Sequence, residues 1–271
     1  MFLTHKNSLR NNEFEVLSQY NNEYIILNGN QWELISNICP HQHSLISVKS
    51  GEGNRVCPYH NWSFTASGLP LTSGRTEHYC KNQNPLQTLP AYVWNSLIFS
   101  HPVEFEVPVD FSNLTLMEKR IDVVKSRNIN IMDLFLDVDH IPTVHAGVYD
   151  KIGITDFSDI KWKYYNNGSI QLVYDNGELS AAWIAVYPYT MIEWQRGSLF
   201  VTVAIENQNK EYSSVHVFKY TSGNENWLLN NSVWETAWFQ DRTQAELINT
   251  VNFENLEIQK LHYRKYLNQW N

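Results

Sequence analysis

The pattern of apolar and polar positions divides the chain into a β-rich first part and a second part that combines helices with strands. Residues 14–38 alternate around the turn Asn28-Gly29-Asn30, which predicts a hairpin formed by residues 24–27 and 32–35. Val56 and Phe64 bracket a later loop, and residues 84–99 have the pattern of closing strands. We therefore expect an all-β domain over residues 1–104, with residues 103–110 crossing into a second domain.

In the second domain, residues 105–271, the spacing of the apolar residues changes twice along the chain. Residues 129–140 place apolar and acidic side chains on different sides at helical spacing, which predicts a helix. Residues 160–220 are β-rich and contain the turn dipeptides Asn167-Gly168 and Asn176-Gly177, which predict an antiparallel sheet. Residues 225–270 lack glycine and proline, and their pattern is helical again. Helices on both sides of a sheet region in the sequence indicate an α+β domain.

Composition and charge narrow the class of protein. The 271 residues are 43% hydrophobic and 18% charged, as in packed globular proteins. A net charge of −8 without a Lys/Arg run disfavours a nucleic-acid partner. The 3 cysteines provide no disulfide framework, so we expect a cytoplasmic protein. We expect no signal peptide and no membrane span, because the longest apolar stretch, residues 179–187, is far shorter than the roughly 20 residues that cross a bilayer.

Two short cysteine–histidine couples carry the strongest chemical signal. The first is Cys39-Pro40-His41 and the second is Cys57-Pro58-Tyr59-His60, with 15 residues between His41 and Cys57. Each couple supplies one thiolate and one imidazole, as the two loops of a [2Fe-2S] cluster with mixed ligands do. A tetrahedral zinc site accepts the same four residues. Zinc motifs, however, usually pair Cys with Cys and His with His along the chain, whereas the order alternates here.

The stretches CPHQHSL and CPYHNWSF resemble the two cluster-binding loops of the Rieske non-haem iron oxygenases. The resemblance implies that Cys39 and Cys57 bind one iron of the cluster, and that His41 and His60 bind the other. Respiratory-chain Rieske proteins carry additional cysteines that brace these loops, and this chain has none there, so it resembles the oxygenase type.

Two positions in these loops depart from the family pattern, which usually has glycine where His43 and Asn61 stand. Glycine is favoured where a loop needs a positive φ, and asparagine tolerates that conformation better than most residues. Asn61 is therefore a mild change. We expect His43 to be an exposed loop histidine and not a fifth ligand.

A second group of candidate metal ligands lies at the end of the predicted helix. Asp137, His140 and His145 have the spacing D-x-x-H-x-x-x-x-H. Three residues apart on a helix, Asp137 and His140 would share one face. Pro142 should end the helix, so that His145 can fold back toward His140. Two imidazoles and one carboxylate form the facial triad of a non-haem Fe(II) site.

The Rieske oxygenases have this spacing after their Rieske domain. The resemblance implies that His140 and His145 bind the mononuclear iron, and that Asp137 bridges His140 to the cluster ligand His60 across neighbouring subunits of a trimer. Asp139 fits by composition equally well, but it lies two residues from Asp137 and therefore on a different helix face.

The third iron ligand must come from the carboxy-terminal helices. Residues 239–246 resemble the family's run F-x-D-x-x-x-x-E, which makes Asp241 the candidate and Glu235 the second choice. One further departure concerns the asparagine that the family often carries three residues before the bridging aspartate. This chain has Leu134 at that position.

Together, these features resemble the oxygenase (alpha) component of a Rieske non-haem iron oxygenase, with a Rieske domain and a helix-grip-like catalytic domain. The resemblance implies a homotrimer that activates O2 at Fe(II), with electrons from NAD(P)H supplied by a separate reductase, directly or through a ferredoxin. The product would be a hydroxylated, dealkylated or desaturated small molecule. The alternatives are a Rieske-type electron-transfer protein with a non-catalytic second domain and a colourless, zinc-stabilised binding module.

Overall fold

The structure, a computed structural model, describes residues 1–10, 13–17, 23–28, 31–73, 84–107, 109–166, 168–175, 179–223 and 226–250. The chain divides into two compact units, one of residues Phe2–Pro102 and one of Met1 with Val103–Asn271. The boundary expected from the sequence, after residue 104, lies close to this division. Each unit has its own hydrophobic core, and each is described by itself.

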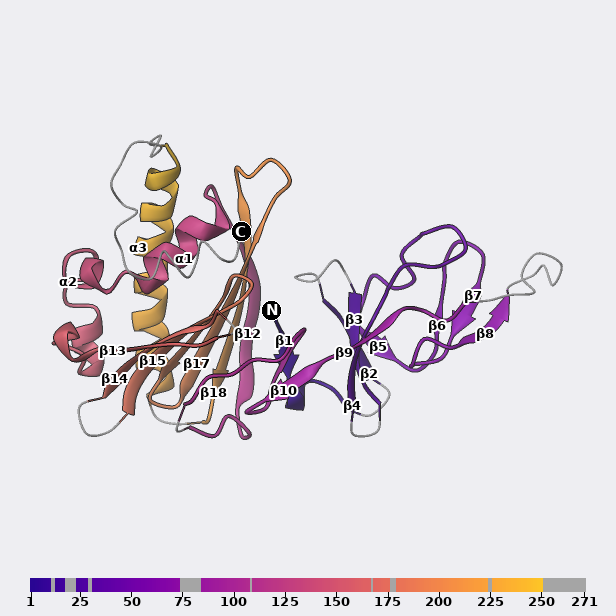
Figure 1. Cartoon of the computed structure of the whole chain (residues 1–271), viewed down its shortest axis with the longest axis horizontal. Coiled ribbons are helices and arrows are strands. Elements are labelled where there is room, and N and C mark those ends of the chain that lie inside the picture. Colours follow the sequence, from indigo (N-terminus) through magenta and orange to yellow (C-terminus); the bar gives the residue numbers. More distant parts are fainter. Residues whose placement is uncertain are drawn as a thin grey trace. The chain divides into compact units, whose positions relative to one another are not determined.

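The first unit consists of antiparallel strands in small sheets (Figure 1). Strands β3 (Glu23–Asn28) and β4 (Gln31–Ile35) form the predicted hairpin, whose turn at residues 29–30 lies outside the described residues. Strands β6 (Arg55–Val56) and β7 (Trp62–Phe64) pair on either side of the second cysteine–histidine loop. The remaining elements are β1 (Phe2–His5), η1 (Lys6–Ser8), β2 (Glu13–Leu17), β5 (Gly51–Glu52), β8 (Pro70–Ser73), β9 (Thr88–Pro90), β10 (Tyr92–Trp94) and β11 (Leu97–Phe99).

The second unit is built on a seven-stranded antiparallel sheet with the strand order β12-β18-β17-β16-β15-β14-β13 (Figure 1). The β-rich region expected at residues 160–220 supplies six of these strands. Strand β12 (Thr115–Val124) was not predicted, because most of its side chains are exposed or half-buried and give little apolar alternation. The other strands are β13 (Lys161–Tyr164), β14 (Ile170–Asp175), β15 (Leu179–Val186), β16 (Thr190–Gln195), β17 (Ser198–Glu206) and β18 (Ser213–Thr221).

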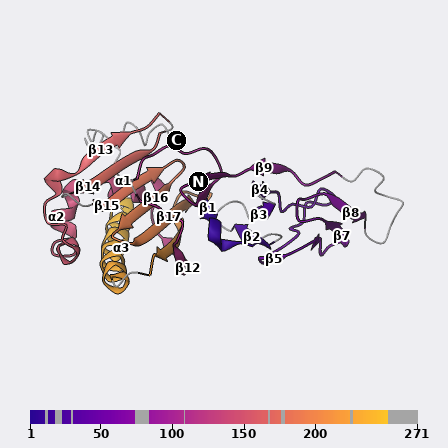
Figure 2. The ribbon, with the colours of Figure 1, turned by 90° about the horizontal axis from the view of Figure 1, so that it is seen from below.

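Among the described residues of this unit, three α-helices pack on one face of the sheet: α1 (Asn128–Leu136), α2 (Ile141–Val144) and α3 (Trp227–Thr250), of which α3 is the longest (Figure 2). The predicted carboxy-terminal helical region extends to residue 270, but residues 251–271 lie outside the described part of the chain. Among the described helices, none combines the length and the apolar character that crossing a membrane requires. Short 3₁₀ turns are η2 (Val138–His140), η3 (Tyr149–Ile152) and η4 (Phe157–Asp159).

The helix predicted over residues 129–140 is interrupted, and the prediction that Asp137 and His140 share one helix face is wrong. Helix α1 ends at Leu136, and Asp137 has extended backbone angles, with φ −81° and ψ 91°. The side chain of Asp137 accepts a hydrogen bond from the N–H of Asp139 at 3.1 Å and so caps η2. Pro142 lies in the first turn of α2 instead of ending a helix. Aspartate at an N-cap and proline in a first turn are both favoured, and these local preferences start new turns here.

A cluster of charged side chains lies between α3 and the edge of the sheet. Lys219 is fully buried and pairs with Glu118 at 2.7 Å and with Glu235. The guanidinium of Arg120 contacts Glu118 at 2.7 Å, Glu235 at 2.5 Å and Asp122 at 3.1 Å. A buried charge is costly unless it is paired, so Glu235 has a structural role in satisfying Lys219.

Candidate metal centres

The two cysteine–histidine loops are closed by the same pair of backbone hydrogen bonds. In each loop the cysteine N–H donates to the carbonyl of the fifth residue after it, and the N–H of the fourth residue donates back to the cysteine carbonyl, at 2.7–2.9 Å. The fourth residues are His43 and Asn61, with φ 54° and φ 60°. Both therefore adopt the left-handed conformation that favours glycine. The side chain of His43 is exposed, as the sequence indicated.

The candidate cysteine ligands Cys39 and Cys57 lie in the core of the first unit, and their thiols interact with one another. Burial raises the pKa of Cys39. Burial also acts to raise the pKa of Cys57, but the hydroxyl of Ser44, 3.1 Å from its sulfur, and the backbone N–H groups of Tyr59 and His60 outweigh burial and lower it. Since the thiolate is the form that binds metal, this surrounding favours a ligand role for Cys57.

The candidate histidine ligands of the same loops face each other. The rings of His41 and His60 have centroids 4.7 Å apart, and His41 also stacks on Trp62 at 4.8 Å. The Nδ1 atom of His41 is buried and has no hydrogen-bond partner among the described residues. A buried ring nitrogen without a partner suits a metal-bound atom. The two thiols thus meet as one pair and the two imidazoles as another, on the same two loops, and this donor set fits a [2Fe-2S] cluster with mixed ligands.

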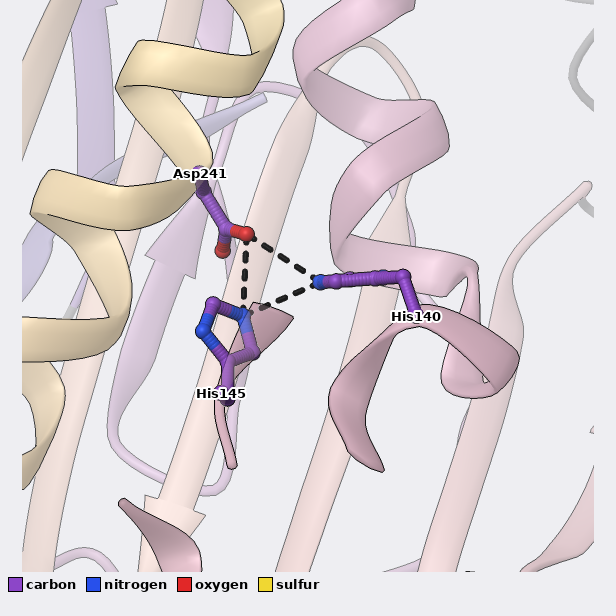
Figure 3. A group of neighbouring side chains, drawn as sticks. All are labelled: His140, His145 and Asp241. Carbon is purple, nitrogen blue, oxygen red and sulfur yellow. Dashed lines mark hydrogen bonds and ion pairs between the residues drawn. The ribbon is translucent and has the colours of Figure 1, made fainter. Parts of the chain in front are cut away.

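A second group of donors comes together between the segment that follows α1 and helix α3 (Figure 3). His140 ends η2, His145 follows α2, and Asp241 lies on α3. The two Nε2 atoms are 3.0 Å apart, and Oδ1 of Asp241 lies 3.2 Å from Nε2 of His140 and 2.9 Å from Nε2 of His145. Ligand atoms about 2.1 Å from one metal and at right angles to each other are about 3 Å apart, so these three atoms fit a facial triad.

Burial and mutual contact set the charges of this group. Burial acts to raise the pKa of Asp241, but the neighbouring imidazoles of His140 and His145 outweigh burial and lower it. Burial lowers the pKa of His140, but the hydrogen bond and charge of Asp241, with the charge of Asp137, outweigh burial and raise it. The carboxylate is therefore held in its charged form, which is the form that binds a divalent cation.

Sequence reasoning missed Gln240, which precedes the candidate ligand Asp241. Its Oε1 lies 2.8 Å from Nδ1 of His145. Because an amide oxygen only accepts hydrogen bonds, Nδ1 of His145 carries the hydrogen. The lone pair on Nε2 of His145 therefore points toward the other two candidate ligand atoms, Nε2 of His140 and Oδ1 of Asp241. Only its place beside Asp241 in the sequence could have drawn attention to this glutamine.

The structure also places Glu235, the second candidate for the third iron ligand, and Leu134, which stands where the family often has asparagine. Glu235 is held by Arg120 and Lys219 and is not part of the group of three donors. Leu134 is buried in an apolar cluster with residues of the sheet and α3, so its side chain offers no polar group near the histidines.

A cleft of about 280 Å³ adjoins this group at His145. Its walls include the aromatic rings of Tyr149 and Phe157 and the carboxylate of Asp150, and the other lining residues are apolar, glycine or threonine. Trp183 on β15 packs on the helix-covered face of the sheet with Tyr149, whereas Trp194 on β16 packs against Phe111.

With this geometry in view, comparison with known proteins identifies the first unit. Residues 1–89 match the family of Rieske [2Fe-2S] domains. These residues form a Rieske domain. A curated relative, putrescine 2-hydroxylase from Ralstonia nicotianae (strain ATCC BAA-1114 / GMI1000), is 23% identical over 219 residues. The match covers 66% of this chain and 57% of the relative's length.

Solved structures of Rieske oxygenases share the fold of the whole chain. The quaternary ammonium Rieske monooxygenase CntA in complex with L-carnitine has a TM-score of 0.74 at 16% identity, with 96% of this chain and 80% of that chain covered. Naphthalene 1,2-dioxygenase with indole bound has a TM-score of 0.70 at 15% identity, covering 96% and 76%. NdmA of Pseudomonas putida CBB5 with caffeine has a TM-score of 0.60 at 13% identity, covering 98% and 88%.

These comparisons confirm the resemblance to the Rieske oxygenases and the predicted fold class. The chain joins an all-β Rieske domain to an α+β unit with an antiparallel sheet and flanking helices. The roles of individual residues as ligands stay predictions.

Proposed function

We propose that the protein is the oxygenase component of a Rieske non-haem iron oxygenase, acting on a small organic molecule. The observation that carries the proposal is the convergence of His140, His145 and Asp241 within one chain that also holds a Rieske domain. An electron carrier with a non-catalytic second domain would have no need to keep three buried or half-buried ligand-type side chains together.

The proposed division of labour follows the two units. Residues 1–104 form the Rieske domain, in which Cys39, Cys57, His41 and His60 hold the [2Fe-2S] cluster. Residues 105–271 form the catalytic domain, in which two histidines and Asp241 hold Fe(II). When bound, the cluster would supply electrons one at a time and the iron would supply O2 activation.

The chain's own residues have defined tasks in this reaction. Asp241 stays ionised and neutralises charge at the centre of the group. Gln240 fixes the ring of His145 so that Nε2 faces that centre. The cleft beside His145, with the rings of Tyr149 and Phe157 in its wall, holds the substrate next to the candidate iron ligands. Asp137 is proposed to accept hydrogen bonds from His140 and from His60 of a neighbouring subunit, and so to position both imidazoles.

Two partners follow from this proposal. The contact through Asp137 crosses a subunit boundary, and the resemblance to the family makes the assembly a homotrimer. Inter-subunit electron transfer is named for the related quaternary ammonium monooxygenase. Electrons from NAD(P)H require a separate reductase, with or without a ferredoxin, because the chain offers no further cofactor site that we identify among its described residues.

Consumption of O2 tests the function directly. The purified protein, mixed with a surrogate reductase, NADH and a panel of small molecules, should consume O2 faster with at least one compound and release a modified product. Reduction of the cluster without any substrate-dependent O2 consumption across a broad panel would favour the electron-carrier alternative.

Replacement of Cys57 tests the cluster. The Cys57→Ala variant loses one thiolate, so it should lose the red-brown colour and the electron paramagnetic resonance signal of the reduced cluster. Visible absorption, iron and inorganic sulfide are measured. The third cysteine, Cys80, lies in neither motif, so Cys80→Ala is the matched control and should keep the colour. A colourless wild-type protein that holds one zinc and no sulfide would contradict the assignment.

Replacement of Gln240 tests the orientation of His145. The Gln240→Leu variant removes the acceptor of the Nδ1 hydrogen, and we expect metal affinity to fall by about 10- to 100-fold, as for other groups that orient metal-bound histidines. The Gln240→Glu variant restores an acceptor and should recover most of the affinity. Titration with Co(II), followed by its visible spectrum, measures both. Equal affinity of the Leu variant and the wild type would show that Gln240 does not position the ring.

A further inference from the structure

Two tryptophans in the catalytic unit donate hydrogen bonds to one buried carboxylate. Glu193 lies on β16, and only 3% of its surface is exposed. One of its carboxylate oxygens accepts a hydrogen bond from Nε1 of Trp183 at 3.1 Å, and the other accepts one from Nε1 of Trp234 at 3.0 Å. Both donors are neutral, so the two indoles hold the carboxylate in place without neutralising it. Ionised groups inside proteins are usually paired with an opposite charge, so this arrangement calls for another explanation.

The contact with the carboxylate changes the chemistry of the indoles. Removal of one electron from an indole leaves a positive charge on the ring and makes its N–H group strongly acidic. A carboxylate that already accepts this hydrogen stabilises the charge, because attraction between charges is strong at short range inside a protein. The carboxylate can also take the proton, since burial raises the pKa of Glu193 to about 7 and makes it a stronger base than an exposed glutamate. The contact therefore favours oxidation of an indole with transfer of its proton to Glu193.

Trp183 lies close to the candidate iron ligands, with one aromatic ring between them. The ring centroid of Trp183 is 6.0 Å from that of Tyr149, and the centroid of Tyr149 is 5.7 Å from that of His145. Rings at these distances meet edge to face, so an electron can pass from Trp183 through the ring of Tyr149 to the imidazole. Burial raises the pKa of Tyr149, so its phenol keeps its proton and resists oxidation. Tyr149 therefore acts as a bridge, and Trp183, which has a proton acceptor, is the better source of an electron.

The two indoles that contact Glu193 differ in their surroundings. Nζ of Lys219 lies 5.0 Å from the ring centroid of Trp234, and Cζ of Arg120 lies 5.8 Å from it. Positive charges over a ring make the removal of an electron from that ring more costly. Trp183 instead packs in the apolar cluster between the sheet and the helices. Trp183 is therefore the easier of the two to oxidise, and Trp234 helps to fix the carboxylate.

From this geometry we propose that Trp183 is a one-electron donor to the mononuclear metal site and that Glu193 accepts its indole proton in the same step. The inference rests on the proposed oxygenase function and adds a redox-active side chain to it. The step occurs when O2 or peroxide has oxidised the site and the cluster has no electron to give. One electron passes from Trp183 to the site, and the hydrogen on Nε1 moves as a proton to Glu193. The products are a neutral indolyl radical, a protonated Glu193 and a site reduced by one electron.

The donor protects the side chains around the metal site. An oxidised site without an electron source reacts with the groups next to it, and the rings of His145 and Tyr149 lie there. An electron from Trp183 ends that reaction. The next electron that the reductase supplies restores the indole, with the proton returned by Glu193.

Hydrogen peroxide tests the donor without substrate or reductase. The full-length protein, with its cluster oxidised and Fe(II) bound, is mixed with peroxide at pH 8 and frozen rapidly for electron paramagnetic resonance. Peroxide takes one electron from Fe(II) and one from Trp183, and leaves as two hydroxide ions. The wild type should give an organic radical signal whose splitting changes when ring-deuterated tryptophan is incorporated. Oxidation of the Fe(II) without a tryptophan radical would overturn the inference.

Replacement of Trp183 identifies the residue that carries the radical. The Trp183→Phe variant should lose the signal, and mass spectrometry of its peptides should show more oxidation of Tyr149 and His145 than in the wild type. Trp194→Phe is the matched control, because Trp194 is a buried tryptophan that packs against Phe111, and it should keep the signal. Thermal melting, cluster absorption and bound iron establish that each variant is intact. An unchanged signal in an intact Trp183→Phe variant would contradict the proposal.

Replacement of Glu193 tests the proton transfer. The Glu193→Gln variant keeps an oxygen that accepts one indole hydrogen, but its amide carries no charge and takes no proton. The yield of the radical should fall by about 10-fold or more, as expected when a charged hydrogen-bond partner becomes neutral. Glu211→Gln is the control, because Glu211 is an exposed acid on the loop between β17 and β18, and its yield should match the wild type. An unchanged yield in a folded Glu193→Gln variant would remove Glu193 from the step.

The outcome for the donor is separable from the outcome for the oxygenase function. If a substrate stimulates O2 consumption and peroxide gives no tryptophan radical, the inference fails and the oxygenase proposal stands. If peroxide gives the radical on Trp183 and no compound of a broad panel stimulates O2 consumption, the oxygenase proposal fails and the donor stands. A protein that binds no mononuclear iron would overturn both.

Discussion

The Asp241→Ala variant should lose the mononuclear iron and all activity while its Rieske cluster stays intact. Asp241 supplies the only carboxylate of the three converging donors, and its pKa is lowered so that it is charged at neutral pH. Without it, two neutral imidazoles face the metal alone. We expect metal affinity to fall by more than about 100-fold, beyond the loss caused by groups that only orient a ligand. Iron analysis, cluster absorption and O2 consumption measure the three effects.

The control for Asp241 is Glu235, the acid that the sequence left as second choice. Glu235→Gln should keep both metals, because its side chain contacts Arg120 and Lys219 and not the histidines. From the sequence alone, Glu235→Ala would be expected to keep the mononuclear iron and the activity, with no statement about stability. The buried Lys219 changes that expectation, and we now predict a lower melting temperature for the Ala variant with its iron retained. Loss of iron from Glu235→Gln, with iron kept in Asp241→Ala, would reverse the assignment.

The Asp137→Asn variant should keep both metals and lose turnover by about 100-fold, at the upper limit for a group that holds metal ligands in place. The amide oxygen can still accept the N–H of Asp139, so the cap of η2 should persist and the local fold with it. What is lost is the charge that would hold two imidazoles across the subunit boundary. Product formation after reduction of the cluster, measured in a single turnover, isolates this step.

Asp139→Asn is the matched control for Asp137, because Asp139 is an exposed acid two residues away. Its turnover should equal that of the wild type. Sedimentation of the native protein should give a trimer, since the bridge joins two subunits. Normal turnover of Asp137→Asn, or full activity of a strictly monomeric protein, would remove the proposed contact.

How much the sequence could predict depended on how local each feature is. Cys39, His41, Cys57 and His60 lie in two short motifs, and the left-handed turn at Asn61 follows from the family's glycine. The α+β class followed from changes of period. Each of these needed only neighbours in the sequence.

Features that depend on several competing preferences could not be predicted from the sequence. The break of the helix at Asp137 arises because its side chain prefers to cap the next turn, and spacing alone cannot weigh that preference against continuation of the helix. Asp241 could be placed only by resemblance, since no local pattern distinguishes a ligand from a solvated helix acid. Gln240 gains its role from His145, a partner far away in the sequence, so only the folded chain shows it.

Helix α3 limits how this protein can evolve. One helix carries Trp234, whose Nε1 donates a hydrogen bond to the buried Glu193 on β16. About one to two turns later it carries Gln240 and Asp241, which contact the two histidines. Successive residues of an α-helix are rotated by about 100° around the helix axis, because about 3.6 residues complete one turn. A single inserted or deleted residue between Trp234 and Gln240 would therefore separate the indole contact from the ligand contacts. The length of this part of α3 should therefore stay unchanged in every active variant of the protein, whereas single substitutions elsewhere on the helix leave the contacts in place.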